Sequence, residues 1–85
     1  MKLNLLYFAR LREALGRDRE SVEVPAGVAT VAQLRAWLIA RGEPFATAFG
    51  AIKRIRAAVN QTMVGDDAPL AEGAEVAFFP PVTGG

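Results

Sequence analysis

The sequence contains no cysteine and no histidine among its 85 residues. Without cysteine the chain can form neither a disulfide nor a thiolate metal site. Without histidine it lacks the commonest general base and the commonest metal ligand. We therefore expect no bound cofactor and no metal site. We also expect no side chains that carry nucleophilic or acid–base catalysis on their own.

Long apolar runs and an excess of one charge are missing as well. No apolar stretch approaches the ~20 residues that a membrane helix needs, and nothing resembles a signal peptide. Ten basic residues face nine acidic ones, whereas nucleic-acid-binding domains usually carry a clear basic excess. We therefore expect one cytoplasmic domain that binds neither nucleic acid nor membrane.

What the chain does contain is a mixture of strand and helix patterns. Apolar residues alternating with period two predict strands at 2–8, 20–24, 55–60 and 75–79, with a short edge strand at 63–64 after a turn at 61–62. Short helices are expected at 10–15 and 44–50. The main helix begins at a capping box of Thr30 and Gln33 and runs to about Arg41.

This order predicts an α+β fold of the ubiquitin-like β-grasp type, in which one main helix covers a small mixed sheet. The domain is expected to span residues 1–79, and residues 80–85 form an extended, flexible C-terminal tail. Alternation turns Phe8 and Phe79 away from the core, and Met63 lies beside a turn. These three side chains are expected to form an apolar, partner-binding patch at the base of the tail. The alternative is that Phe8 and Phe79 fill a second small core.

The tail has an order of residues that suits insertion into another protein. Two prolines cannot donate ladder hydrogen bonds and so end the last strand. Two β-branched residues favour extended backbone, and two glycines could thread a narrow channel. Six residues can reach about 20 Å. The tail residues are Pro80, Pro81, Val82, Thr83, Gly84 and Gly85.

The carboxylate of Gly85 is unhindered, but a carboxylate is a poor electrophile. Adenylation would give it a good leaving group, and a persulfide could then displace AMP and leave a thiocarboxylate. That group is a sulfur nucleophile that needs no cysteine. A terminal diglycine alone is a weak signal because chain ends are often frayed. Its position after two prolines and a final strand strengthens the interpretation.

Several segments resemble the small subunit of molybdopterin synthase. They are residues 6–13, 57–62, 69–70 and 73–85, of which the ending Phe-Phe-Pro-Pro-Val-Thr-Gly-Gly is the most specific. Residues 42–56 carry no signature of that family. The resemblance implies a β-grasp fold and a sulfur carrier for molybdenum cofactor biosynthesis, with Gly85 as the carrier residue and Gly84 as the residue that lets it thread.

The same resemblance implies a set of partners. An E1-like adenylyltransferase uses ATP to activate the C-terminal glycine, and a sulfur donor protein converts the adenylate to a thiocarboxylate. The large subunit of the synthase then receives the tail, and sulfur passes to cyclic pyranopterin monophosphate. The assembled synthase is a heterotetramer of two small and two large subunits. In that family, positions matching Phe8, Met63 and Phe79 dock the partner, and residues 80–83 would follow the tail into it.

Three other functions remain open at this point. The chain could carry sulfur for thiamine synthesis or tRNA thiolation, since those carriers also end in Gly-Gly. It could be a ubiquitin-like protein modifier, conjugated to lysines through Gly85. It could also be a plain interaction domain whose tail is inert.

Overall fold

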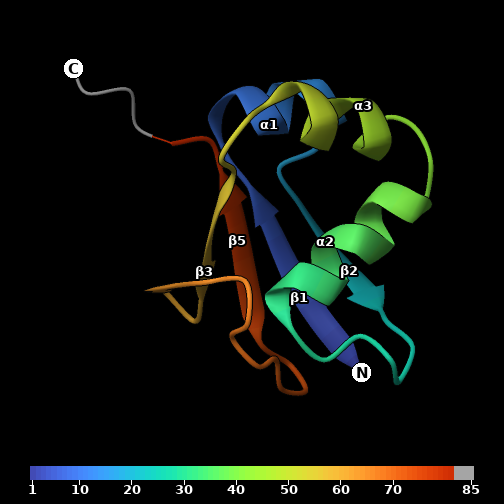
Figure 1. The fold of residues 1–85 in the computed structure, drawn as a ribbon, viewed down its shortest axis with the longest axis vertical. Coiled ribbons are helices and arrows are strands. Elements are labelled where there is room, and N and C mark those ends of the chain that lie inside the picture. Colours follow the sequence, from blue (N-terminus) through green and yellow to red (C-terminus); the bar gives the residue numbers. More distant parts are fainter. Residues whose placement is uncertain (82–85) are drawn as a thin grey trace.

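The fold is a five-stranded mixed sheet with three helices, seen in a computed structural model that describes residues 1–81 (Figure 1). The strand order is β2-β1-β5-β3-β4. The central strand β5 is parallel to its neighbour β1, and the other three strand pairs are antiparallel. The elements are β1 (Lys2–Tyr7), α1 (Ala9–Leu15), β2 (Arg19–Glu23), α2 (Val31–Ala40), α3 (Phe45–Ala51), β3 (Arg56–Val59), β4 (Thr62–Val64) and β5 (Glu75–Phe79).

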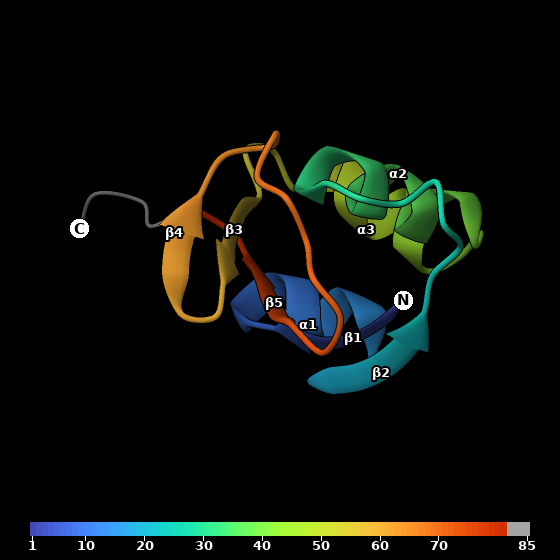
Figure 2. The ribbon, with the colours of Figure 1, turned by 90° about the horizontal axis from the view of Figure 1, so that it is seen from below.

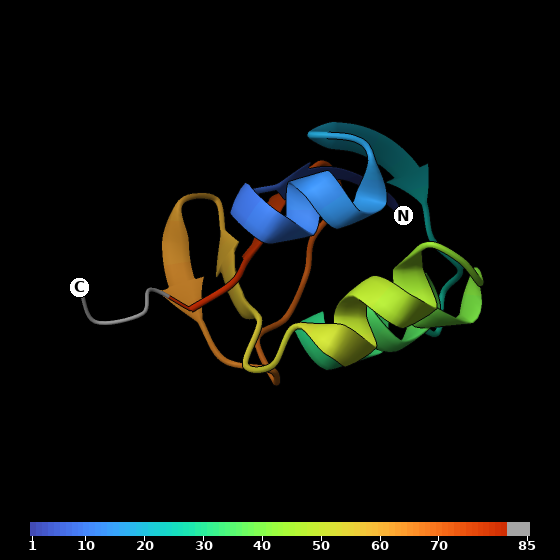
Figure 3. The same cartoon turned by 90° about the horizontal axis from the view of Figure 1, so that it is seen from above.

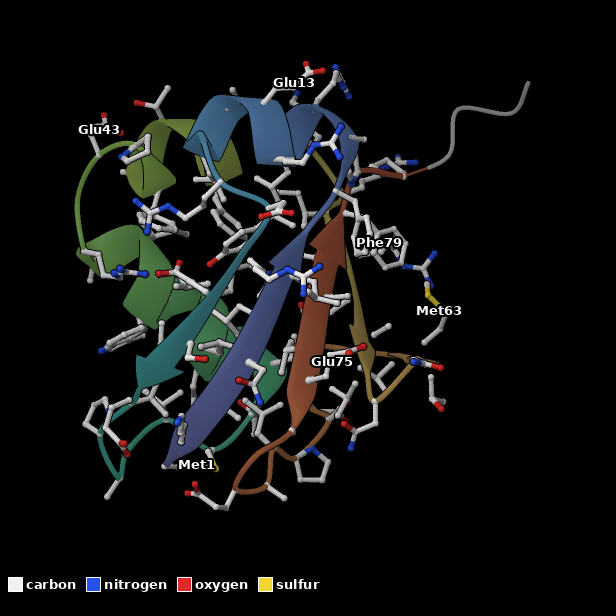
Figure 4. All side chains as sticks on the ribbon, turned by 180° about the vertical axis from the view of Figure 1, so that it is seen from behind. Met1, Glu13, Glu43, Met63, Glu75 and Phe79 are labelled. Atoms are coloured by element: carbon white, nitrogen blue, oxygen red, sulfur yellow. The ribbon has the colours of Figure 1, made fainter. Side chains whose placement is uncertain are left out.

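The helices lie on one side of the sheet and at one of its ends. Helices α2 and α3 form a layer over one face, which we call the closed face (Figure 2). Helix α1 lies across the end of the sheet at which β5 finishes (Figure 3). The opposite face, which we call the open face, has no helix over it in the described part of the chain (Figure 4). The β-grasp prediction is confirmed, although α3 shares the closed face with the expected main helix.

The core fills the space between the closed face and the helices, as the alternation predicts. In β1 every second side chain is buried, and in β5 the side chains of Val76 and Phe78 are fully buried on the same side of the sheet. One face of α2 is buried as well and belongs to the same core. The ring of Phe49 in α3 packs edge-on against the ring of Phe78, with 5.5 Å between their centroids. The central residues of the core are Leu3, Leu5, Tyr7, Val31, Leu34, Leu38, Val76 and Phe78.

The ends of two helices follow from single residues. The hydroxyl of Thr30 accepts a hydrogen bond from the backbone N–H of Gln33 at 3.3 Å, and the Gln33 side chain accepts one from the backbone N–H of Thr30 at 3.1 Å. This is the predicted capping box, which satisfies donors that would otherwise be unpaired. Gly16 ends α1 with a φ of 72°, a left-handed conformation that glycine adopts without strain.

Most element boundaries lie within one residue of the sequence-based predictions, and two of the differences have a clear structural reason. The turn between β3 and β4 is formed by Asn60 and Gln61 rather than by residues 61–62, and both have positive φ. A two-residue hairpin favours that geometry because it matches the twist of the strands, and asparagine tolerates it well. Pro80 is buried, so the folded body continues one residue past Phe79, where the tail was expected to begin.

Candidate docking face and tail

The open face carries a row of apolar side chains that crosses four strands. The strand register places Leu6 beside Ala77, Ala77 beside Ala58, and Ala58 beside Met63. Because directly opposed residues project to the same side of a sheet, these four side chains form one continuous line. We call them the apolar row.

Two aromatic residues lie between the apolar row and the start of the tail. Phe79 ends β5 on the open face and is half-buried, and Phe8 follows β1 in extended conformation with 45% of its surface exposed. Met63, in the edge strand, is 48% exposed and lies on the same side of the sheet as Phe79 (Figure 4). We call the apolar row together with Phe8 and Phe79 the docking face.

Hydrogen bonds from the backbone N–H and to the backbone carbonyl of Phe8 hold this residue outside the core. Its N–H donates to the carbonyl oxygen of Phe78 at 3.2 Å, and its own carbonyl accepts from the N–H groups of Leu11 and Arg12. Ala9 then reverses the chain with a φ of 54°, a left-handed conformation that costs an alanine about 1–2 kcal/mol. The exposure of Phe8 therefore comes from the way α1 begins, and Phe8 does not belong to a second core.

The docking face has a shallow centre and a polar border. The two central alanines are each 8% exposed, and larger side chains flank them at both ends of the row. At the end of the sheet away from the tail, the Ser21 hydroxyl donates to the Asn4 side chain at 2.9 Å. The Asn60 side chain there accepts from the backbone N–H of Glu75 at 3.0 Å. The apolar surface is thus confined to the half of the face that adjoins the tail.

Sequence reasoning found three of the six residues in this face. Phe8, Met63 and Phe79 were expected there, and the structure places all three on the open side. Leu6, Ala58 and Ala77 were missed, because alternation assigns each of them to one face of its own strand but does not show which strands are neighbours. Within the tail, Pro80 is buried and Pro81 is half-buried. The other predicted tail positions, Val82, Thr83, Gly84 and Gly85, lie outside the described residues.

The strongest electrostatic cluster lies on the closed face. The Tyr7 hydroxyl donates to the Glu20 carboxylate at 2.6 Å, and Arg41 forms two further bonds to that carboxylate at 3.0 and 3.3 Å. Burial, helped by the hydrogen bond and charge of Glu20, raises the pKa of Tyr7 well above its usual range. Burial also raises the pKa of Glu20. The bonds from Arg41 and Tyr7, with the charges of Arg41 and Arg17, outweigh it and lower that pKa overall. This cluster stabilises the fold and takes no part in the docking face.

Two further observations concern residues 1–81 as a whole. No helix in this range is long and apolar enough to cross a membrane. No group of three or more acidic side chains in it could hold a metal ion.

Comparison with known proteins gives the docking face and tail a family context. The sequence profile of the ThiS family matches residues 5–85, which is nearly the whole chain. The chain therefore belongs to the ThiS family. Among relatives, it is 48% identical to the molybdopterin synthase sulfur carrier subunit of Escherichia coli. That match covers 98% of this chain and 99% of the relative. The protein of the same name from Haemophilus influenzae is 39% identical, with the same coverage.

Solved structures give the same fold for this ThiS-family chain. It superposes on SAMP1 from Haloferax volcanii with a TM-score of 0.79 and 26% identity, covering all of both chains. A second match, with a TM-score of 0.66, is to a protein–protein complex of subunits 1 and 2 of molybdopterin-converting factor from Helicobacter pylori. All of both chains are covered there too, at 19% identity, so this likeness shows the fold.

Proposed function

We propose that the protein is the sulfur-carrier small subunit of a molybdopterin synthase and works in molybdenum cofactor biosynthesis. The observation that carries the proposal is the 48% identity, over nearly the full chain, to the Escherichia coli molybdopterin synthase sulfur carrier subunit. The geometry supports it, because an apolar face beside the start of a Gly-Gly tail can hold a partner while the tail enters that partner.

The proposed chemistry takes place at the carboxyl group of Gly85. An E1-like adenylyltransferase joins the carboxylate to the α-phosphate of ATP and releases pyrophosphate. The persulfide of a sulfur donor protein attacks the acyl carbon, AMP leaves, and an acyl disulfide forms. A second thiol reduces that disulfide and leaves a thiocarboxylate on Gly85. Its sulfur then attacks the pyranopterin, and hydrolysis of the resulting thioester returns the carboxylate.

Within this cycle the chain itself contributes binding and positioning. The docking face holds the large subunit, with Phe8, Met63 and Phe79 as its largest contacts. Residues 80–83 lead the tail into that subunit, and Gly84 allows the tip to pass a narrow channel. The catalytic side chains come from the partners, in a heterotetramer of two small and two large subunits. No cofactor is bound to the chain, and the ATP is used by the activating partner in the cytoplasm.

The intact mass of the protein tests the carrier chemistry. The protein is incubated with the adenylyltransferase, ATP and a sulfur source, beside a variant that lacks Gly85. Replacing one oxygen by sulfur adds about 16 Da, and we expect that heavier species in the full chain and not in the deletion. Its complete absence from the full chain would overturn the proposal.

A second function, conjugation to proteins, is also tested. The similarity to SAMP1 from Haloferax volcanii favours it, because another matching structure is that of the small archaeal modifier protein 1 of H. volcanii. A modifier forms isopeptide bonds between Gly85 and lysine side chains. Mass spectrometry of lysine-linked Gly-Gly remnants in cells distinguishes the two functions. Sulfur transfer from the thiocarboxylate to the pterin, without conjugates, supports the synthase. If the thiocarboxylate supplied sulfur only for thiazole formation or tRNA thiolation, the protein would be a sulfur carrier of another pathway.

A further inference from the structure

A pocket at the β4 edge of the sheet has three arginines in its lining. It has a volume of about 670 Å³ and lies beside the pair formed by Ala57 in β3 and Val64 in β4, and its lining includes Arg35, Arg54 and Arg56. Asp66 supplies the acidic group of the lining, and Met63 forms part of the wall on the side of the docking face. The pocket therefore joins α2, the loop before β3 and the loop after β4.

The positive charge in this pocket is only partly compensated. Arg35 donates to the carbonyl oxygen of Ile55 at 3.2 Å and forms an ion pair with Asp66 at 3.1 Å. Its Nε is buried and has no hydrogen-bond partner within residues 1–81. Arg54 and Arg56 are exposed and form no ion pair with any described residue. Three cations and one anion leave a surplus of two positive charges.

The backbone at Arg54 adds a second observation. Its φ is 59°, which is a left-handed backbone conformation that residues other than glycine and asparagine seldom adopt. Such a conformation persists where the surrounding structure imposes it, and these positions concentrate at functional sites.

The pocket continues the docking face around the edge of the sheet. Met63 belongs to both, and Arg56 lies opposite Phe79 in the register of β3 and β5. A partner that covers Met63 and Phe79 therefore also covers the mouth of the pocket. Burying two uncompensated guanidinium groups under that partner is costly unless it supplies carboxylates.

We propose, on the basis of the proposed function, that this pocket binds acidic side chains of the large synthase subunit. Arginine suits such contacts because its planar guanidinium can bind a carboxylate through two parallel hydrogen bonds. A phosphate group of the nucleotide or the pterin is a poorer match for the pocket. Both molecules react at Gly85, and a tail extended into a partner carries Gly85 up to about 20 Å from Phe79. The large subunit is favoured over the adenylyltransferase because a lasting complex excludes water from its charges, whereas a passing encounter stays wet.

Binding of the purified large subunit, measured by calorimetry at several salt concentrations, tests this assignment. Arg54→Glu and Arg56→Glu are each expected to raise the dissociation constant about tenfold. The double variant should raise it about 100-fold. The double variant should also show a smaller loss of affinity with added salt. Lys2→Glu makes the same charge change at the far end of β1, and its affinity should stay within about twofold of the unmodified chain.

Two further measurements keep the outcome interpretable. Arg54→Gly removes the charge while relieving the left-handed strain, so it replaces Arg54→Glu if that variant fails to fold. Pyrophosphate release by the adenylyltransferase should change by less than about twofold in the double variant. Equal affinity of the double variant and the unmodified chain for the large subunit would overturn the proposal, as would an equal loss with both partners. Failure of the unmodified chain to bind the large subunit at all would instead count against the proposed function.

Discussion

Strand β5 has two sides of the same apolar character that meet different surroundings. On the closed side Val76 and Phe78 are fully buried beneath helices α2 and α3. On the open side Ala77 and Phe79 face a surface that no described helix covers (Figure 4). A sheet with one face in water normally alternates apolar and polar side chains. The second apolar side of β5 therefore indicates a surface meant to be covered by another molecule.

The open face also differs along its own length. Near the tail it is apolar, and at the far end a row of polar side chains hydrogen-bonds across the strands. A surface evolved only for solubility has no reason to change character along one strand. The change places the apolar part where a partner holding the tail would lie.

The largest effect that separates the two faces is expected for Phe78→Ala. This substitution removes a fully buried ring and leaves a cavity beneath Phe49, which should cost about 3–5 kcal/mol of the free energy of unfolding. Urea denaturation followed by circular dichroism measures that loss. A cost below about 1 kcal/mol would mean that the closed face is not the main core.

The next effect concerns Phe79→Asp on the other side of the strand. Because Phe79 lies outside the core, we expect the free energy of unfolding to change by no more than about 1 kcal/mol. Affinity for the large subunit should fall about 100-fold, since a charge would be buried in an apolar interface. Glu75→Gln, at the opposite end of the same strand, is the control and should bind normally.

Two results would contradict the comparison at Phe79. Loss of the folded spectrum in Phe79→Asp would place that ring in the core. Unchanged affinity in a folded variant would show that the open face does not dock the large subunit.

The sequence was sufficient for the closed face because local rules decide it. Alternation in β1 and β5 identified the buried residues, and the capping box at Thr30 located the start of the main helix. The short helix expected at residues 10–15 is present as α1 and ends at Gly16, whose left-handed conformation glycine adopts without strain. Each of these features depends on residues a few positions apart, so no knowledge of the tertiary arrangement was needed.

The open face and the pocket depend on contacts between distant segments. The apolar row appears only once the strand register is known, because Leu6 and Ala77 are neighbours solely through the β1–β5 pairing. Small residues such as Ala58 look unremarkable in a strand until their neighbours are known. The arginine pocket joins α2 to two loops, and nothing in the local sequence of residues 53–56 shows that Arg54 and Arg56 lie beside Arg35 of α2.

The smallest expected effect lies at the edge of the closed face, in the cluster around Glu20. Its side chain is only 13% exposed and is bonded to Tyr7, Arg17 and Arg41. The net lowering of its pKa means that the folded protein holds Glu20 ionised at a pH where the unfolded chain begins to take up a proton. Glu20 thus contributes stability above its ordinary pKa of about 4.3, and this contribution is lost as pH falls through the lower folded value.

Glu20→Gln should therefore lower the free energy of unfolding by about 1–2 kcal/mol at pH 7, because charge-assisted bonds become neutral ones. The variant should also lose less stability than the unmodified chain as the pH falls below about 5. Urea denaturation at pH 7, 5 and 3 measures both effects, and binding of the large subunit at pH 7 should be unchanged. Parallel stability curves for the two proteins would mean that Glu20 is not held ionised by its neighbours. A weakened affinity would mean that the closed-face cluster and the docking face are coupled, contrary to the separation of the two faces of β5.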